Sequence, residues 1–143
     1  MTTLYKLRDY RETVAFEREH PKELRWDERY KLFMLEENKQ CQGIWLKDKK
    51  DLIAEIIMTW HSDNVAYIES ITVLPAHQSK GLGYQMVTSA IDWASHMKYE
   101  CLMGAARKGR SWHIFENLGA EPVMLHKNWY KTGEDYMLFK MEV

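Results

Sequence analysis

The sequence predicts a mixed α/β fold, in which a mostly antiparallel sheet of about seven strands carries helices on both faces. Two observations predict it. Apolar segments rich in Ile and Val alternate with polar turns in the middle of the chain, which is typical of a strand meander. Segments with apolar residues at helical spacing come before and after this meander. The chain has 143 residues, so we expect one domain, 1–143.

The first third of the chain predicts one strand and two helices. Residues 2–7 form a short strand, and the charged segment 9–20 is weakly periodic and ends before Pro21, which cannot continue a helix. The segment 22–38 predicts an amphipathic helix. The apolar residues that recur there at helical spacing are Trp26, Tyr30, Phe33 and Met34.

The middle of the chain predicts three successive strands. Residues 42–47 and 52–60 are apolar, and the charged stretch KDKKD at 47–51 separates them, which indicates a hairpin. A second turn precedes the third strand, 65–74, and Pro75 ends that strand because proline cannot donate to the ladder.

The last part of the chain predicts two helices and three strands. Gly81 opens a long helix with apolar residues along one face. The remaining elements are a strand at 99–105, a helix at 109–118, and strands at 121–127 and 134–142. The full order is therefore β, α, α, β, β, β, α, β, α, β, β.

Composition and charge exclude several classes of protein. The net charge is −1 and no run of Lys and Arg gathers, so no nucleic-acid partner is expected. No apolar run approaches the roughly 20 residues needed to cross a bilayer, so no membrane partner is expected. Cys41 and Cys101 show neither metal-like nor redox-like spacing, which favours a reducing compartment, and each is expected to be a small buried residue rather than a nucleophile. The expected location is therefore the cytoplasm.

The six histidines predict no metal site. None of them stands in the HxxxH or HExxH spacing that places two ligands on one helix face. We therefore expect no metal cofactor.

The stretch QSKGLG at 78–83 connects the predicted strand 65–74 to the long helix that follows. The stretch does not match a nucleotide P-loop, because Tyr84 follows the second glycine. It does not match a dinucleotide-binding fingerprint either, because Met86 stands where a third glycine is needed. What remains is a series of backbone N–H groups at a helix N-terminus, which favours an anion such as a pyrophosphate. Lys80 adds a positive charge. The alternative interpretation is an ordinary strand-to-helix connection with flexible glycines.

These motifs resemble those of the GNAT superfamily of N-acyltransferases. The family's cofactor motif, Arg or Gln, two residues, Gly, one residue, then Gly or Ala, is matched by Gln78, Gly81 and Gly83. The preceding strand ends in VLP at 73–75, and IFENLGA at 114–120 resembles a second family segment. The element order matches over essentially the whole chain. The closing segment resembles, more loosely, the diamine and polyamine N-acetyltransferase branch.

The resemblance implies acetyl-CoA as co-substrate and a primary amine as acceptor. The acceptor would be a small molecule such as a polyamine, or a protein amine, and transfer would be direct within a ternary complex. Acetyl-CoA would lie in an opening between the fourth and fifth strands. The residues implied to bind it are Ile71, Thr72, Val73, Gln78, Ser79, Lys80, Gly81, Leu82, Gly83 and Tyr84.

Glu69 is the candidate catalytic base. A protonated amine cannot attack a thioester, so a base must remove a proton first. Glu69 interrupts the apolar strand YIESITV, where acidic residues are depleted, and the polyamine branch has a glutamate at the same distance, nine residues before the motif's Arg or Gln, here Gln78. The alternative is a structural carboxylate, hydrogen-bonded in the sheet or exposed.

The chain departs from the family pattern at the general acid. The family's tyrosine, four residues before the glycine of the second segment, is Phe115 here, and phenylalanine cannot donate a proton. Either water or another group protonates the thiolate, or the protein is an acyl-CoA-binding sensor or interaction module with weak or no catalysis. The side chains considered as replacements are Ser111, His113, Tyr130 and Tyr136.

The resemblance also implies where the acceptor enters and how copies associate. The acceptor cleft should involve residues 17–30, whose acidic side chains are candidates for holding a cation. A homodimer is expected, with the apolar last strand, YMLFKMEV, as an exposed edge. Trp26, Trp60 and Trp93 are assigned to the core or to the packing of helices on the sheet. Three further tryptophans are candidates for lining the acceptor cleft, namely Trp45, Trp112 and Trp129.

Overall fold

A computed structural model describes all residues except 1, 6, 8–9, 23–24, 39 and 130–131. The strands are β1 (Thr2–Tyr5), β2 (Cys41–Asp48), β3 (Asp51–Ser62), β4 (Val65–Val73), β5 (Cys101–Arg107), β6 (Glu121–His126) and β7 (Tyr136–Glu142). The helices are α1 (Arg11–Glu17), α2 (Glu28–Leu32), α3 (Leu82–His96) and α4 (Trp112–Asn117). A π-helical turn, Phe33–Glu37, and a 3-10 turn, Pro75–His77, complete the order.

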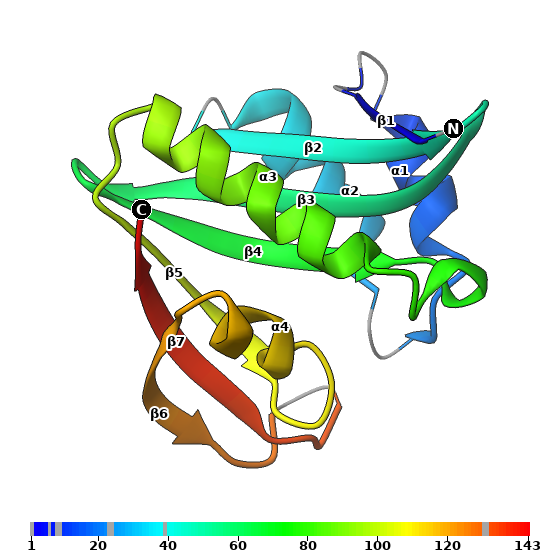
Figure 1. Ribbon diagram of the computed structural model, residues 1–143. Helices are drawn as coiled ribbons and strands as arrows, with labels where there is room; N and C mark the ends of the chain where they lie inside the picture. Colours follow the sequence, from blue (N-terminus) through cyan, green and yellow to red (C-terminus); the bar gives the residue numbers. More distant parts are fainter. Residues whose placement is uncertain (1, 6, 8–9, 23–24, 39, 130–131) are drawn as a thin grey trace.

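The strands form one seven-stranded sheet in the order β1-β2-β3-β4-β5-β7-β6 (Figure 1). Neighbouring strands are antiparallel except β4 and β5, which are parallel. A parallel pair needs a crossover, and α3 provides it between these two strands. The predicted fold class and the order of the elements are confirmed.

Helices cover both faces of the sheet, with α3 and α4 in front and α1 and α2 behind in the view of Figure 1. The face under α3 holds the larger core, which includes four residues of that helix, Met86, Val87, Ala90 and Ala94, all with no exposed surface. The other face holds a smaller core of Leu7, Leu35, Trp45 and Ile57. The apolar face predicted for the long helix is therefore the face that packs on the sheet.

The helix predicted over 22–38 is shorter and irregular. The Asp27 side chain accepts hydrogen bonds from the backbone N–H groups of Arg29 and Tyr30, so the helix begins only after this N-cap. The π-helical turn that follows α2 then shifts the phase of the side chains. As a result Met34 is buried, whereas Tyr30 is 48% and Phe33 52% exposed. The single apolar stripe predicted for this segment is wrong.

Two further expectations are corrected by the topology. The last strand, β7, lies between β5 and β6 and so offers no free edge; the edge is β6, where Val123 and Met124 are exposed. The argument for a homodimer through the last strand is wrong, and the homodimer stays a prediction. Trp60 is 46% exposed near the end of β3 and does not belong to the core.

A buried ion cluster joins α1 and α2 to β3. The Lys31 ammonium contacts the carboxylates of Glu17 and Glu55, the latter at 2.7 Å from Nζ to Oε2. Trp45 Nε1 donates to Glu55 Oε1 at 2.7 Å, and the Thr13 hydroxyl donates to the same oxygen. All five side chains are buried, so the cluster fixes both helices against the back of the sheet.

Candidate active site

The site begins where β4 and β5 separate. Their parallel pairing runs from Val65 with Cys101 to Ile68 with Gly104. Beyond that point β4 continues beside β3, and β5 continues beside β7. Figure 1 shows β5, β7 and β6 turned away from the rest of the sheet on this side. The two strands therefore leave an opening between them.

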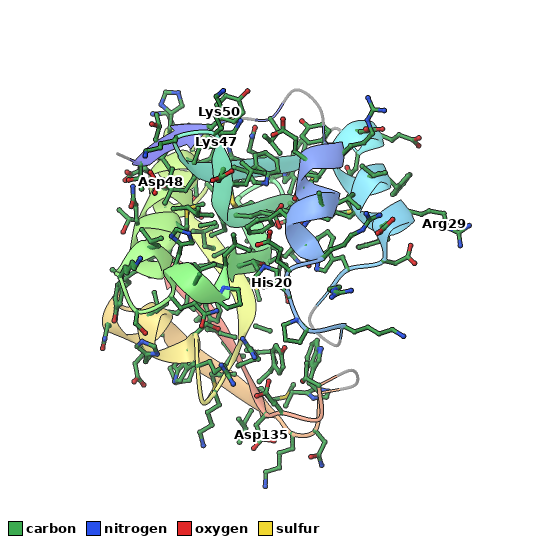
Figure 2. The ribbon with its side chains drawn as sticks, turned by 90° about the vertical axis from the view of Figure 1, so that its right-hand side faces the viewer. His20, Arg29, Lys47, Asp48, Lys50 and Asp135 are labelled. Carbon is green, nitrogen blue, oxygen red and sulfur yellow. The ribbon has the colours of Figure 1, made fainter. Side chains whose placement is uncertain are left out.

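The larger of two adjoining cavities, about 570 Å³ in volume, lies at this opening. Its wall includes seven successive β4 residues, 67–73, together with Ala105 and Arg107 of β5. Further residues of the wall come from the segment that runs from the end of α1 into α2, from around the β6–β7 turn, and from the segments just before α3 and α4. These other residues include His20, Arg25, Trp26, Tyr30, Trp129, Thr132 and Tyr136. Figure 2 shows His20 below the end of α1, on the side that faces the sheet.

Glu69 lies at a β-bulge in β4. Met58 of β3 pairs with Ile68, and the next β3 residue back, Ile57, pairs with Ser70, so Glu69 is the extra residue. The bulge reverses the alternation: Ile68 packs in the core under α3, and after the bulge Ile71 packs there instead of Ser70. The half-buried Glu69 lines the larger cavity and accepts a hydrogen bond of 2.8 Å from Thr59 Oγ1.

The Glu69 carboxylate is surrounded by groups that respond to its charge. Burial, and then the Glu69 charge, raise the pKa of the Tyr30 and Tyr67 phenols. Burial, followed by the charges of Glu69 and Glu55, raises the pKa of the Cys41 thiol to about 12. These three groups are therefore neutral at physiological pH.

A smaller cavity of about 430 Å³ adjoins the first. It lies between the start of α3 and the start of α4, and residues 81–84 and His113 belong to its wall. Six residues line both cavities, namely Ile71, Val73, Gln78, Arg107, Arg110 and Ser111. The two cavities therefore meet at the opening between β4 and β5.

The turn before α3 fits an anion. Gly81 is the N-cap with φ +79°, and no side chain caps the helix there. The first intrahelical bond joins Gln85 N to Gly81 O at 3.2 Å, so the amides just before Gln85 precede the helical ladder. A Cβ at Gly81 would meet no atom within 4 Å, whereas one at Gly83 would lie 2.6 Å from Ile114 Cδ1. The 15-residue α3 directs its positive dipole end into the smaller cavity.

The structure brings most of the predicted cofactor-binding residues together. Those that line the smaller cavity are Ile71, Val73, Gln78, Ser79, Gly81, Leu82, Gly83 and Tyr84. Thr72 lines only the larger cavity. Lys80 is exposed and lines neither. The Gln78 side chain donates to Val73 O at 3.0 Å, which ties the turn back to the end of β4.

The candidates for a general acid are spread over the site. Phe115 is 1% exposed and stacks on Phe139 at 4.4 Å between ring centroids, so it belongs to the core and lines neither cavity. Ser111 lines both cavities, and His113 lines the smaller one. Tyr136 lines the larger cavity, and burial raises its pKa, which keeps the phenol protonated. Tyr130 lies outside the described residues.

Sequence reasoning missed part of this wall. Of the three tryptophans considered for the acceptor cleft, Trp129 lines the larger cavity, but Trp45 and Trp112 are buried. Trp26, assigned to the core, lines the cavity as well. Tyr67 was not singled out, although it stands two residues before Glu69 in the same strand, a spacing that places both on one face.

The described part of the chain has neither a cluster of potential metal ligands nor a membrane-spanning helix. No three side chains of His, Cys, Asp or Glu gather there in a way that could hold a metal ion. No helix in that part is both long and apolar enough to span a bilayer.

Known protein structures share this fold over nearly the whole chain. The ribosomal-protein-S18-alanine N-acetyltransferase of Escherichia coli is 21% identical, with a TM-score of 0.85, and the match covers 100% of this chain and 94% of that one. Spermidine N-acetyltransferase of Vibrio cholerae, solved with CoA and spermine, is 14% identical, with a TM-score of 0.79. The match covers 99% of this chain and 95% of that one. YncA of Salmonella typhimurium, solved with its cofactor acetyl-CoA, is 16% identical, with a TM-score of 0.76. The match covers 99% of this chain and 93% of that one.

A search of curated protein sequences finds no match to the chain. The sequence model of the acetyltransferase (GNAT) family, however, matches residues 2–120. That range contains the whole strand meander, the glycine turn and both helices that border the smaller cavity. The chain therefore belongs to the GNAT family of acetyl-CoA-dependent acetyltransferases.

Proposed function

We propose that this protein transfers an acetyl group from acetyl-CoA directly to a primary amine, of a small molecule or a protein, within a ternary complex. The observation that carries this proposal is the position of Glu69. It lies at the bulge where β4 leaves β5, on the wall of the larger cavity and two residues from Ile71, which lines both cavities. A carboxylate there stands between a site for the cofactor and a site for the amine.

The smaller cavity is assigned to the pyrophosphate of acetyl-CoA. The backbone amides of residues 79–84 and the α3 dipole offer several donors for it. Ile71, Thr72 and Val73 lie along the opening, where the pantetheine arm would reach toward the larger cavity. Lys80 adds a charge at the surface beside the turn. When bound, acetyl-CoA supplies a thioester, the acyl donor of the reaction.

Glu69 would prepare the amine for attack. Its carboxylate takes a proton from the acceptor ammonium, directly or through a water molecule, and leaves the nitrogen with a free electron pair. Thr59 holds the carboxylate by its hydrogen bond. The leaving sulfur needs a proton in return, and Tyr136 and Ser111 line the larger cavity as donors for it.

A second candidate function is an acyl-CoA-binding sensor or interaction module with little turnover. Phe115 favours it, because the position of the family's tyrosine is occupied here by a buried ring packed on Phe139. Such a protein would bind acetyl-CoA in the same smaller cavity and release thiol slowly whatever amine is supplied.

Release of free thiol from acetyl-CoA with a panel of primary amines tests the proposal. Glu69→Gln keeps the shape of the side chain but removes the base, so we expect amine-dependent release to fall by about 10²- to 10⁴-fold. Acetyl-CoA binding, measured by calorimetry, should stay unchanged. Glu36→Gln, at an exposed site away from both cavities, is the matched control.

Three other outcomes are informative. Tight acetyl-CoA binding without amine-dependent thiol release would favour the sensor. Full activity in Glu69→Gln would show that this carboxylate is not the base. No acetyl-CoA binding, or binding that survives Gly81→Glu together with Gly83→Glu, would contradict both functions.

A further inference from the structure

The larger cavity has a single negative charge on its described wall. Glu69 is the one carboxylate among the described residues that line it, whereas Arg25, Arg107 and Arg110 contribute three guanidinium groups. Glu134 partly offsets the last two, at 3.3 Å from Arg107 and 3.9 Å from Arg110. The wall therefore offers one anionic partner for an ammonium and repels further positive charge.

Three of the five acidic residues of 17–30 are engaged elsewhere, and a fourth, Glu23, lies outside the described residues. Glu17 is buried against Lys31, and the Asp27 side chain caps α2. Glu28 pairs with Arg18 at 2.8 Å on the surface. The expectation that acidic side chains of 17–30 hold a cation is therefore not met by these three residues, none of which lines the larger cavity.

Aromatic rings form two walls of the same cavity. Trp26 and Tyr30, from the segment entering α2, lie 5.3 Å apart between centroids. Trp129 and Tyr136, from the region between β6 and β7, stack at 4.7 Å. Such rings attract a cation over their faces and remove apolar surface of a ligand from water.

The carboxylate and the aromatic rings belong to one subsite. Tyr30 and Tyr67 are close enough to Glu69 for its charge to contribute to their raised pKa values. Both phenols are neutral at physiological pH, so they bring polar hydrogen-bonding groups but no additional charge next to the carboxylate. An ammonium placed at Glu69 would therefore share this cavity with aromatic rings that can pack on the apolar part of the ligand.

On this basis, and resting on the proposed function, we propose that the acceptor is a monocation whose single amine stands next to an aromatic or large apolar group. Arylalkylamines and polypeptide N-termini with an aromatic or bulky apolar first residue share this chemistry. Polyamines do not fit the described part of the wall, because a second ammonium would enter a cavity where the described charged groups other than Glu69 are guanidinium ions.

Matched amines test the charge argument. Pentylamine and 1,5-diaminopentane share one carbon chain and differ by the second ammonium, so kcat/KM for the diamine should be at least about tenfold lower. 2-Phenylethylamine should exceed pentylamine by about threefold to tenfold, because its ring packs on the aromatic walls. A diamine turned over as well as pentylamine, or better, would overturn the proposal.

Peptides identify the source of the acceptor. A short peptide with a free N-terminal Phe is compared with the same peptide beginning with Gly, and with 2-phenylethylamine. Faster acetylation of the Phe peptide than of the free amine indicates a polypeptide acceptor, and the reverse indicates a small arylalkylamine; both support the proposal. A preference for the Gly peptide would overturn it. Absence of turnover with every amine would overturn it together with the proposed function, whereas a diamine preference would leave that function standing.

Substitutions in the aromatic walls provide the second readout. Tyr30→Ala, at a largely exposed ring, should reduce the preference for 2-phenylethylamine over pentylamine to near one without changing acetyl-CoA binding. Trp129→Ala, in the second aromatic wall, should do the same. Trp60→Ala is the matched control, since this ring is similarly exposed at 46% but lies outside both cavities. An unchanged preference in both cavity variants would contradict the aromatic subsite.

Discussion

Two glutamates interrupt neighbouring apolar strands, and the structure gives them opposite surroundings. Glu55 in β3 has no exposed surface and is held by Lys31, Trp45 and Thr13. Glu69 in β4 is half-buried, accepts from Thr59, and faces a cavity. The same break in an apolar pattern therefore marks a structural ion cluster in one strand and a candidate catalytic base in the next.

The difference arises from what lies opposite each carboxylate. α1 and α2 pack directly over Glu55 and supply a buried ammonium, which satisfies the carboxylate and leaves it unavailable to a ligand. Glu69 lies where β5 has separated from β4, so no neighbouring strand covers it on that side. A bulge adds one residue there, which orients the side chain toward the opening. Position in the sheet, more than residue type, separates the two roles.

Removing the ammonium of the cluster should have the largest effect on stability. Lys31→Met leaves the Glu17 and Glu55 carboxylates buried without their cation, so we expect the free energy of unfolding to fall by about 3–5 kcal/mol. Urea denaturation followed by tryptophan fluorescence measures it. Lys140→Met, at an exposed pair with Glu121, is the matched control and should change stability by less than about 1 kcal/mol.

The same cluster can be neutralised as a whole. Lys31→Met combined with Glu17→Gln and Glu55→Gln removes the unpaired charges, and it should recover part of the lost stability. Equal urea midpoints for Lys31→Met and Lys140→Met would contradict a structural role for the cluster. Glu69→Gln should leave the midpoint near that of the wild type, which separates the two glutamates.

The local parts of this arrangement were predictable and the long-range parts were not. The Gln78–Gly83 turn is continuous in sequence, so its glycines and the helix after it predicted an anion site. The apolar runs predicted the succession of strands along the chain. Glu69 stood out because a carboxylate is unusual in a strand. Glu55 carries the same signal in LIAEIIM, but its partner Lys31 lies 24 residues away and Thr13 42 residues away. Such contacts depend on how α1 and α2 dock.

The aromatic walls of the larger cavity could not be predicted from the sequence for a similar reason. Tyr30 was expected on the buried face of a helix over 22–38, but the Asp27 cap and the π-helical turn rotate it into the larger cavity. Trp129 and Tyr136 join the site only because β7 inserts between β5 and β6. Neither the late helix start nor the strand insertion follows from periodicity alone.

A matched pair of threonine substitutions tests the comparison at the level of single hydrogen bonds. Thr59→Val removes the donor to Glu69, so kcat should fall by about three- to tenfold, while stability changes little. Thr13→Val removes a donor to Glu55, so it should lower the free energy of unfolding by about 1–3 kcal/mol and leave kcat near that of the wild type. Equal effects of both variants on both measurements would mean that the two carboxylates share one role.

His20 lies between the two regions and should produce the smallest effect. It lines the larger cavity beyond the end of α1 (Figure 2). Its buried Nε2 has no hydrogen-bond partner among the described residues. Burial is the main cause that lowers its pKa from 6.5; the charges of Lys31 and Arg25 add to this, and those of Glu55 and Glu19 oppose it. A lowered pKa means that the unfolded chain binds a proton first as the pH falls. This contribution to stability is therefore complete above pH 6.5 and is lost as the pH falls through the lowered pKa.

His20→Phe separates this contribution from the titration of every other group. The ring keeps the edge-on contact with Phe16 but cannot be protonated. Between pH 7.5 and 5.5 the wild type should lose stability relative to the variant by less than about 1 kcal/mol, measured as the difference in urea midpoints at each pH. The same difference at both pH values would show that His20 does not couple proton binding to folding. A larger loss of stability in the wild type would indicate that protonation of His20 also disturbs the ion cluster around Glu55. The ion cluster and the wall of the larger cavity would then share a titrating group.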